Sequence, residues 1–503
     1  MRRLLHTLRS VLLPEGDLAT RSVRSGAWEL GLNLGTRGLE LVVLVVLARL
    51  LTPADFGLIG IALLTFGGVN RLTRLGLDEA LIYNADEDVD RYLDTAWTLS
   101  VVRGCALGAF IFLVAPVVAG VFGEPRAADV IRGIALVPVI TGLRNPAALY
   151  FVKELQFHRQ FVYRFSGSFV DFGVALAFAL AFRSVWALVF GYLAGEATRL
   201  LASYLLHSYR PALRPDRALA TEMLGYGKWI TANNGLAFLL GKGDDVFVGW
   251  YLSATALGLY QVAFRTASAP ATEVTKTISN VLFSTYAKLQ GDDAALRRTF
   301  VRTMQLVSVV SFPMAVGIVV VAPAFIEGVL GPQWLPATGA MQLLAVYGLL
   351  VSLTAAFHQI WKALGRPDYV TRVGTVRLVA LALVIVPATA AFGITGTAAA
   401  VAGVYVFVAL PVDLFLMHRL IGVGPRRLAA EVAVPFTASV GMAATTLLVR
   451  ASVAGVPAVV ELVLLVAVGG ASYAVLLVGL DRRFSWGLRG NLRVVSGAFG
   501  RSG

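Results

Sequence analysis

Cysteine is nearly absent from this chain, in which Cys105 is the single example among 503 residues. One thiol cannot form an internal disulfide or a zinc site built on several cysteines. The sequence also lacks an Asn-x-Ser/Thr sequon, so it offers no acceptor for N-linked glycosylation. Because Cys105 lies in an apolar segment, we interpret it as a small buried hydrophobic residue.

Charged residues are scarce too. They make up 15% of the chain, against roughly 25% in ordinary soluble domains. Hydrophobic residues account for 57%, and apolar runs long enough to cross the ~30 Å hydrocarbon core of a bilayer recur along the sequence. A soluble protein could not bury that much apolar surface in one core. The composition therefore predicts an all-α polytopic membrane protein.

Enzyme signatures are missing. The stretch GLAFLLGKG at 235–243 is similar to a phosphate-binding loop, but its spacing is one residue too long and Gly243 stands where Ser or Thr is needed. The sequence has no His-Glu-x-x-His motif and no extramembrane segment long enough for a catalytic or nucleotide-binding domain. We therefore expect a protein that is not an enzyme and has no cofactor or metal, apart from a coupling ion such as H⁺ or Na⁺.

The apolar runs predict about fourteen spanning helices joined by short loops. Their approximate limits are 22–50, 56–75, 93–120, 129–151, 161–182, 185–206, 224–249, 258–285, 300–325, 337–361, 369–391, 394–418, 430–450 and 457–480. Lys and Arg gather in every second loop and in the C-terminal tail, except that the loop after the second helix is acidic, and the positive-inside rule places these loops in the cytoplasm. An even number of helices puts both termini there. The net charge of +13 thus indicates the anionic headgroups of the plasma (inner) membrane rather than nucleic acid.

Part of the chain matches itself at a shift of about 200 residues, which indicates an internal repeat. The aligned pairs are Gly26–Gly227, Trp28–Trp229, Asn33–Asn234, Leu51–Leu252, Gly57–Gly258, Leu58–Leu259 and Ala62–Ala263. Each copy holds an even number of helices, about six, so two lobes of the same topology are expected around a central cavity.

These features together predict the domain organisation. The predicted parts are a cytoplasmic interfacial segment (1–20), an N-terminal six-helix lobe (21–206), a basic cytoplasmic linker (207–221), a C-terminal six-helix lobe (222–420), two further helices (421–480) and a basic cytoplasmic tail (481–503). The short apolar stretch of 1–20 is interrupted by His6, Arg9 and Pro14, which argues against a cleavable signal peptide. The linker is expected to lie on the cytoplasmic surface and to let the lobes rock.

Three predicted helices carry polar and ionisable groups on one face, and such groups usually face a wet interior because they are costly in lipid. They are Glu29, Asn33, Arg37 and Glu40 in the first helix, Thr231, Asn234, Lys242 and Asp245 in the seventh, and Arg265, Thr272, Glu273, Lys276 and Asn280 in the eighth. We interpret them as lining a shared cavity. In the competing interpretation they pair locally, as Arg37 with Glu40 and Glu273 with Lys276 would at i,i+3 spacing.

Further polar groups in the spans allow two interpretations. Asp171 and Glu196 are expected near the middle of their helices, either as proton or sodium sites or as partners of Arg199 and Arg103. His358 is able to titrate, but a single histidine in a helix is more often structural.

Several stretches resemble, in order, the polysaccharide transporters of the multidrug/oligosaccharidyl-lipid/polysaccharide exporter superfamily, which include O-antigen and teichuronic acid exporters. They are LARLLTPADFGLIGIA (47–62), LGLDEALI (75–82), ALGLYQVAFR (256–265), VLFSTYAKLQ (281–290), GPQWLPA (331–337) and ALGRPD (363–368). The resemblance implies a two-lobed fold with a central cavity. It also implies a flippase that moves a polyprenyl-pyrophosphate-linked oligosaccharide to the outer leaflet by alternating access. The related lipid II flippases use cavity arginines for the pyrophosphate.

The polar residues suit such a substrate chemically. Pyrophosphate needs several fixed cations, for which the candidates are Arg37, Lys242, Arg265 and Lys276. Candidates for the sugar are Asn33, Asn234, Thr272 and Asn280, and candidates for ion coupling are Glu29, Asp245 and Glu273. The expected partners are a lipid-linked oligosaccharide, membrane lipids and glycan-assembly enzymes. The alternative function is a cation-coupled exporter of small drugs on the same fold, against which the many cations in the spans argue.

Overall fold

The computed structural model describes the backbone of residues 35, 38–73, 90–154, 156–453, 455–484 and 486–487, and their side chains except at 90–91, 152, 157, 218, 220, 222–233, 269–281 and 284. Within these ranges the chain is helical and has no strand. Eight stretches of the described chain are long and apolar enough to cross a membrane. The all-α membrane fold is therefore confirmed, whereas the total of about fourteen crossings stays a prediction.

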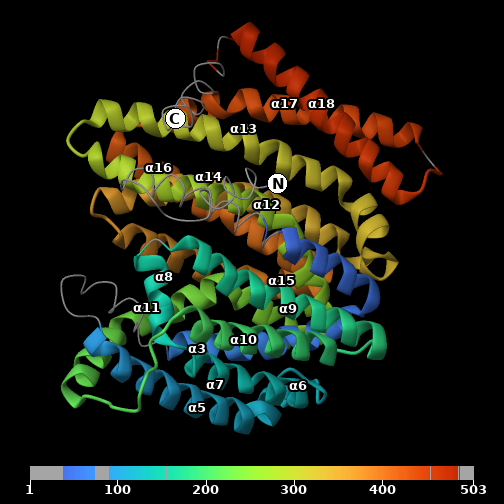
Figure 1. Cartoon of the computed structure of the whole chain (residues 1–503). Coiled ribbons are helices and arrows are strands. Elements are labelled where there is room, and N and C mark those ends of the chain that lie inside the picture. Colours follow the sequence, from blue (N-terminus) through green and yellow to red (C-terminus); the bar gives the residue numbers. More distant parts are fainter. Residues whose placement is uncertain are drawn as a thin grey trace, which may run out of the picture. The chain divides into compact units, whose positions relative to one another are not determined.

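The chain forms two compact units that divide after Gly258, and Figure 1 labels most of their helices. The first unit contains a helical stretch over 38–50, followed by α3 (Pro53–Leu72), α5 (Asp90–Val121), α6 (Ala127–Ile134), α7 (Leu136–Gly142), η1 (Pro146–Leu149), α8 (Tyr150–Lys153), α9 (Phe157–Phe182), α10 (Trp186–Leu206) and α11 (Arg217–Tyr251). The helix α12 (Ala254–Lys288) begins in this unit and continues into the second. The predicted lobes, 21–206 and 222–420, follow the sequence repeat and stay a prediction.

The second unit continues from Leu259. It contains most of α12, then α13 (Asp293–Phe325), η2 (Ile326–Leu330), η3 (Pro332–Ala337), α14 (Thr338–Ala363), α15 (Asp368–Val404), η4 (Tyr405–Ala409), α16 (Leu410–Ile421), α17 (Pro425–Ser452) and α18 (Ala458–Phe484). In Figure 1 the red helices α17 and α18 lie side by side and next to α13.

The start of α3 is encoded locally. Thr52 accepts a hydrogen bond from the backbone N–H of Asp55 at 3.3 Å, and Asp55 Oδ2 accepts one from the backbone N–H of Thr52 at 3.0 Å. This reciprocal capping box satisfies backbone donors that the first helical turn leaves unpaired. Pro53 follows at the first helical position, where a missing N–H costs nothing.

Glycines let α9 and α10 pack closely. A Cβ atom added at Gly191 would meet the backbone oxygen of Asp171 at 2.8 Å, and one added at Gly195 would meet the backbone oxygen of Gly167 at 2.8 Å. Small residues at such positions allow two membrane helices to gain van der Waals contact along their backbones. The pair α9–α10 is thereby a rigid support for the side chains that project from it.

The predicted span 129–151 is not one helix. It divides into α6, α7, η1 and α8, with breaks at Ala135 and at residues 143–145. Pro138 lacks the N–H that would bond to the carbonyl of Ile134, so the helical ladder is interrupted there. Asn145 then caps η1 by accepting a hydrogen bond from the N–H of Ala147 at 3.0 Å.

The apolar stretch Asp368–Ile421 has 54 residues and would be ~81 Å long as one straight helix, far more than a bilayer needs. Gly393 breaks it with φ +57°, a conformation that favours glycine. Thr389 and Thr397, eight positions apart, are joined by a 2.8 Å hydrogen bond between their hydroxyls, so the chain reverses direction between them. The break falls between the predicted spans 369–391 and 394–418.

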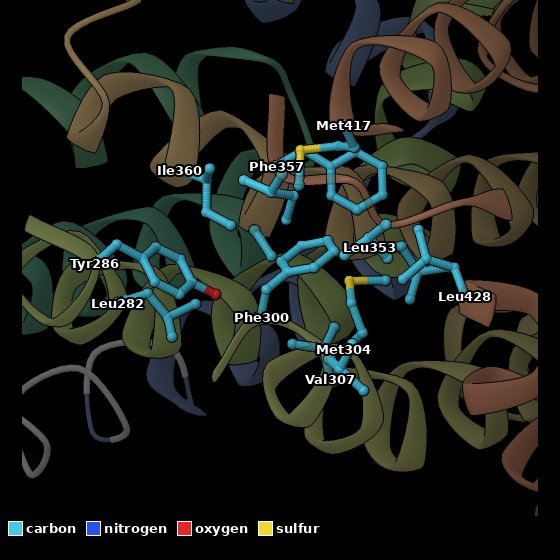
Figure 2. Packing of buried hydrophobic residues seen from close by; sticks show 14 of the residues in the cluster. Leu282, Tyr286, Phe300, Met304, Val307, Leu353, Phe357, Ile360, Met417 and Leu428 are labelled. Atoms are coloured by element: carbon cyan, nitrogen blue, oxygen red, sulfur yellow. The ribbon is translucent and has the colours of Figure 1, made fainter. Parts of the chain in front are cut away.

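The core of the second unit joins α12, α13, α14, α16 and α17. Figure 2 shows the rings of Phe300 and Phe357 between Tyr286 on one side and Leu428 on the other. The two phenylalanine rings are 5.4 Å apart between centroids, and the Tyr286 hydroxyl donates to Thr303 Oγ1 at 3.1 Å. This core fixes the helices that carry the polar groups of the unit.

Cys105 lies exposed on α5, so its interpretation as a buried residue is wrong. The same helix also exposes Val102, Phe112 and Leu113. In a membrane protein such an apolar surface faces lipid, and a small hydrophobic residue needs no protein partner there.

The linker predicted over 207–221 is bound to the first unit in its N-terminal half. The Tyr209 hydroxyl and the backbone N–H of Ala212 both donate to Asp94 Oδ1, at 2.6 and 2.9 Å. Asn145, which is 1% exposed, donates from Nδ2 to the carbonyl of Tyr209 at 2.7 Å. The helix α11 already begins at Arg217, so most of the predicted linker is either bound to the first unit or helical.

Candidate functional site

The predicted polar faces lie partly within the described residues. Glu29, Asn33 and Arg37 lie outside them, as do the side chains of Thr231, Thr272, Glu273, Lys276 and Asn280, although the last five stand on the described helices α11 and α12. The convergence of the three faces on one cavity therefore stays a prediction. Lys242, Asp245, Asn234 and Arg265 have described side chains.

Lys242 and Asp245 form a local ion pair on α11. Lys242 Nζ lies 2.8 Å from Asp245 Oδ2, at i,i+3 spacing. The lysine side chain is 44% exposed, whereas the aspartate side chain is 4% exposed. Local pairing thus occurs at this position, but it leaves the cationic end accessible. An incoming anion would contact Lys242 before it reached the carboxylate.

Asn234 lies on the side of α11 that packs against α3. Nearby, Gly68 lies beside the ring of Phe238, and Gly235 lies beside Leu72. The Nδ2 atom of Asn234 is buried and has no hydrogen-bond partner among the described residues. Buried amide groups are normally paired, so this one is suited to donate to an oxygen of a ligand.

Arg265 is exposed on α12 and is followed by two buried hydroxyl residues, Thr266 and Ser268. Thr266 donates to the carbonyl of Val262 at 2.7 Å, and Ser268 donates to the carbonyl of Phe264 at 2.6 Å. Because these hydroxyls bond to their own helix, the polar group that α12 presents here to a ligand is the Arg265 guanidinium.

A second group of charges, which we name the Glu196 cluster, consists of Arg144, Ser168, Glu196 and Arg199 in the first unit. Glu196, 7% exposed, lies between the two arginines. Arg199 Nη1 contacts Glu196 Oε1 at 2.6 Å, Arg144 Nη2 contacts Oε2, and Arg199 Nη2 donates to Ser168 Oγ at 3.1 Å. Two guanidinium groups share one carboxylate, so the cluster has one excess positive charge.

This cluster decides between the two interpretations of Glu196. Glu196 is a partner of Arg199, as one of them proposed, and its second partner is Arg144, which the sequence analysis missed. The one signal for Arg144 was an arginine standing in an apolar run directly before Asn145 and Pro146.

The described partners of Arg103 lie at the end of α3, and its pairing with a carboxylate stays a prediction. Its Nε donates to the carbonyl of Thr73 at 2.8 Å, and its Nη2 donates to the carbonyl of Asn70 at 2.9 Å. These carbonyls lie at the end of α3, where the helix leaves acceptors without intrahelical donors. A cation there also offsets the negative end of the helix dipole. Arg103 thus caps α3 from the neighbouring helix α5.

His358 lies against Trp361 in α14, with 5.2 Å between the ring centroids. This packing agrees with a structural histidine. The second unit also contains the buried carboxylate Asp413, which the sequence analysis did not single out. It is a lone acidic residue in the run LPVDLFLM at 410–417, a pattern that was its only signal.

The comparison with known families gives a match to a family model described as polysaccharide biosynthesis protein, over residues 46–339. The lipopolysaccharide biosynthesis protein WzxC of Escherichia coli (strain K12) is 27% identical over 354 residues, which cover 70% of this chain and 72% of the relative. The succinoglycan biosynthesis transport protein ExoT of Rhizobium meliloti (strain 1021) is 26% identical over 347 residues, covering 68% and 69%. The teichuronic acid biosynthesis protein TuaB of Bacillus subtilis (strain 168) is 23% identical over 296 residues, covering 58% and 61%.

Two solved structures share the fold. A lipid II flippase MurJ in an inward closed conformation aligns with a TM-score of 0.76 at 11% identity, over 91% of this chain and 99% of that one. An inward-facing multidrug resistance MATE family transporter of the MOP superfamily aligns with a TM-score of 0.59 at 14% identity, over 78% and 94%. The family model covers more than half of the sequence. The chain is a multi-pass membrane protein that belongs to the polysaccharide biosynthesis protein family and has the fold of the MOP superfamily.

Proposed function

We propose that this protein is a flippase that moves a lipid-linked oligosaccharide from the cytoplasmic to the outer leaflet of the plasma (inner) membrane. The observation that carries the proposal is the family match over residues 46–339, together with relatives whose names place them in lipopolysaccharide and succinoglycan biosynthesis or transport. A solved neighbour with the same fold is named a lipid II flippase. The function is transport, and the proposal includes no enzymatic step.

The head group of such a substrate carries a pyrophosphate, which needs cations that are reachable from the aqueous side. We propose Lys242 and Arg265 for this role, since both are cationic and their side chains are not buried within the protein. Arg37 and Lys276 complete the proposed set. A guanidinium binds phosphate oxygens in a bidentate manner, while an ammonium group acts as a point charge.

The sugar requires neutral hydrogen-bonding groups, for which we propose Asn33, Asn234, Thr272 and Asn280. Asn234 has an amide N–H without a partner among the described residues, as a sugar donor site requires. Glu29, Asp245 and Glu273 are the proposed ion-coupling carboxylates. Asp245 is already engaged with Lys242, so an anion bound to Lys242 would weaken that ion pair and favour a cation or proton at Asp245.

Transport would proceed by alternating access of two lobes around the substrate, with both termini in the cytoplasm and the polyprenyl tail remaining in lipid. The energy would come from an ion gradient, the membrane potential or removal of the product. Glycan-assembly enzymes are the proposed protein partners.

The test replaces Arg265 and Lys276 together with Ala in a host strain that depends on this protein for export. Loss of one charge-assisted hydrogen bond costs about 1.5–3 kcal/mol, so losing both should reduce export by at least about 100-fold. The lipid-linked intermediate should then accumulate in the inner leaflet, where a membrane-impermeant glycan-modifying reagent reaches it only after the membrane is opened.

The matched control is Arg126→Ala, which removes an exposed arginine from the loop before α6 and should leave export unchanged. Normal export by a well-expressed double variant would remove the site assignment. If overexpression instead gave resistance to small cationic drugs, with no effect on glycan export, the alternative of a drug exporter would replace the proposal. This alternative is included in the test because a solved neighbour with the same fold is named a multidrug resistance transporter.

A further inference from the structure

An aromatic side chain, Phe238, stands on the polar face of α11. Asn234, Phe238 and Lys242 follow one another at intervals of four residues, so they share one side of the helix, each about 6 Å along the axis from the next. Asp245, which pairs with Lys242, lies on the same side. An apolar ring is therefore placed between an amide group and an ion pair.

One face of this ring rests on the backbone of α3, which packs beside α11 (Figure 1). The two helices run antiparallel here, since Gly235 lies beside Leu72 and Phe238 lies beside Gly68. A Cβ atom added at Gly68 would lie 3.2, 3.4 and 3.8 Å from Cζ, Cε1 and Cε2 of the ring. The three distances are similar, so this position lies over the face of the ring and not beyond its edge. The glycine thus lets the outer end of the ring approach the backbone of α3.

The rest of the ring is not enclosed in the same way. Phe238 is half-buried, and no aromatic ring or cation stacks on it among the described residues. Phe247, on the same helix, differs in this respect because its ring stacks on that of Tyr251, with 5.2 Å between the centroids. The ring of Phe238 is therefore held by α3 at one end and keeps part of its surface accessible.

A ring and a donor side by side are what a sugar needs. The C–H groups of a sugar ring carry small positive partial charges, and the face of an aromatic ring is negative, so the two stack. The hydroxyl groups at the edge of the sugar then require hydrogen-bond partners. Asn234, one helical turn before Phe238, has a buried Nδ2 without such a partner among the described residues. Packing against Gly68 would explain the ring alone, whereas a sugar explains the ring and the unpaired amide together.

We propose that Phe238 is the residue on which the first sugar of the substrate stacks, the sugar that is bonded to the pyrophosphate. Lys242 binds the pyrophosphate one turn further along α11, and Asn234 donates to a sugar hydroxyl one turn before. This order follows from the spacing, because a step of about 6 Å is close to the length of one sugar unit. The inference rests on the proposed function and specifies how its site holds the substrate.

The stack also defines the class of sugar that fits. A first sugar whose hydroxyl groups all point outward from the ring edge presents a broad C–H face to Phe238. A hydroxyl that projects from that face holds the sugar away from the aromatic ring and loses the contact. We therefore expect the protein to select lipid-linked glycans whose first sugar has one open C–H face.

The experiment measures lipid binding to the purified full-length protein with two probes. One probe is polyprenyl pyrophosphate without a sugar, and the other is the polyprenyl-pyrophosphate-linked oligosaccharide extracted from the host. The wild type should bind the glycosylated lipid more tightly. Phe238→Leu keeps an apolar side chain beside Gly68 but removes the ring, so it should weaken binding of the glycosylated lipid by about three- to tenfold and leave binding of the bare lipid unchanged.

Two further variants complete the test. Phe238→Tyr keeps the ring and should retain the preference for the glycosylated lipid. Phe247→Leu is the matched control, since it removes the same side chain from the same helix half a turn round its circumference, and it should also retain the preference.

An equal loss of affinity for both lipids in Phe238→Leu would overturn the inference, because the ring would then only hold α11 against α3. An unchanged preference in this variant, or equal affinity of the wild type for both lipids, would overturn it as well and leave the proposed function standing. If the wild type bound neither lipid, the proposed function would fail together with the inference.

Discussion

Charged side chains in the apolar helices are compensated in three different ways. Arg103 donates to the carbonyls at the end of α3, Glu196 lies between two arginines, and Lys242 pairs with a carboxylate one turn further along its own helix. These solutions differ in accessibility. The exposed end of Lys242 suits ligand binding, whereas Arg103 and Glu196 lie between helices and stabilise their packing.

The Glu196 cluster gives a prediction at this scale. Glu196→Gln keeps the shape of the side chain but leaves two guanidinium groups without their shared carboxylate. Removing one member of a buried ion pair costs about 3–5 kcal/mol, and we expect the lower end because the arginine side chains are 23% and 19% exposed. Denaturant unfolding of the purified protein in detergent measures the change.

The control for this substitution is Asp129→Asn, which breaks an i,i+3 pair with Arg132 whose side chains are 69% and 41% exposed. An exposed pair contributes less than about 1 kcal/mol. Equal losses in the two variants would mean that the Glu196 cluster does not hold α9 and α10 to the turn before η1.

At the scale of elements, the second helices of the two predicted repeats begin alike, and their first turns contact each other. The helices α3 and α12 start at Pro53 and Ala254, each two positions after an aligned leucine. A Cβ atom added at Gly57 would lie 1.7 Å from the backbone oxygen of Ala254, and one added at Gly258 would lie 2.0 Å from that of Pro53. The contact is reciprocal, so both glycines are required for one close helix crossing.

We predict that Gly57→Ala and Gly258→Ala each lower stability by about 1–3 kcal/mol, because a backbone oxygen cannot yield without separating the helices. Combined, they should cost less than the sum, since both act on the same crossing. The thermal unfolding midpoint in detergent measures each effect. Gly120→Ala in α5, where nothing lies within 4 Å, is the control and should be neutral or slightly stabilising. If Gly57→Ala left the unfolding midpoint unchanged, the backbones of α3 and α12 would lie farther apart at this crossing than in the structure.

At the scale of the whole molecule, the predicted topology places alternate loops on opposite sides of the membrane. Ser452 precedes an outer loop and Ala294 follows a cytoplasmic one in this prediction, and both side chains are exposed. The chain has one native cysteine, so a Cys105→Ala background is easy to prepare.

On that background a membrane-impermeant maleimide should label Ser452→Cys in intact cells and label Ala294→Cys only after permeabilisation. Cys105 itself, exposed on an apolar face of α5, should react poorly with the same reagent because lipid covers it. Labelling of both single-cysteine variants from outside would contradict the odd number of crossings that is predicted between them.

The sequence by itself determined the membrane class, most helix limits and the family, because these follow from local patterns. Apolar runs of spanning length, the Thr52–Asp55 capping box and the glycine at the α15 break each act within a few residues. The structure extended several helices beyond the predicted spans, since their ends lie outside the hydrocarbon core and carry polar residues that hydropathy discounts.

The tertiary structure alone decided which charges meet. Arg144 and Glu196 are far apart in sequence and become partners only when α10 packs beside the broken helix α6–α7. In the same way, Arg377 and Tyr405 become partners only because the chain reverses at Gly393. A charged residue in an apolar span can be recognised from the local sequence. Its partner depends on packing between distant segments, which no local pattern encodes.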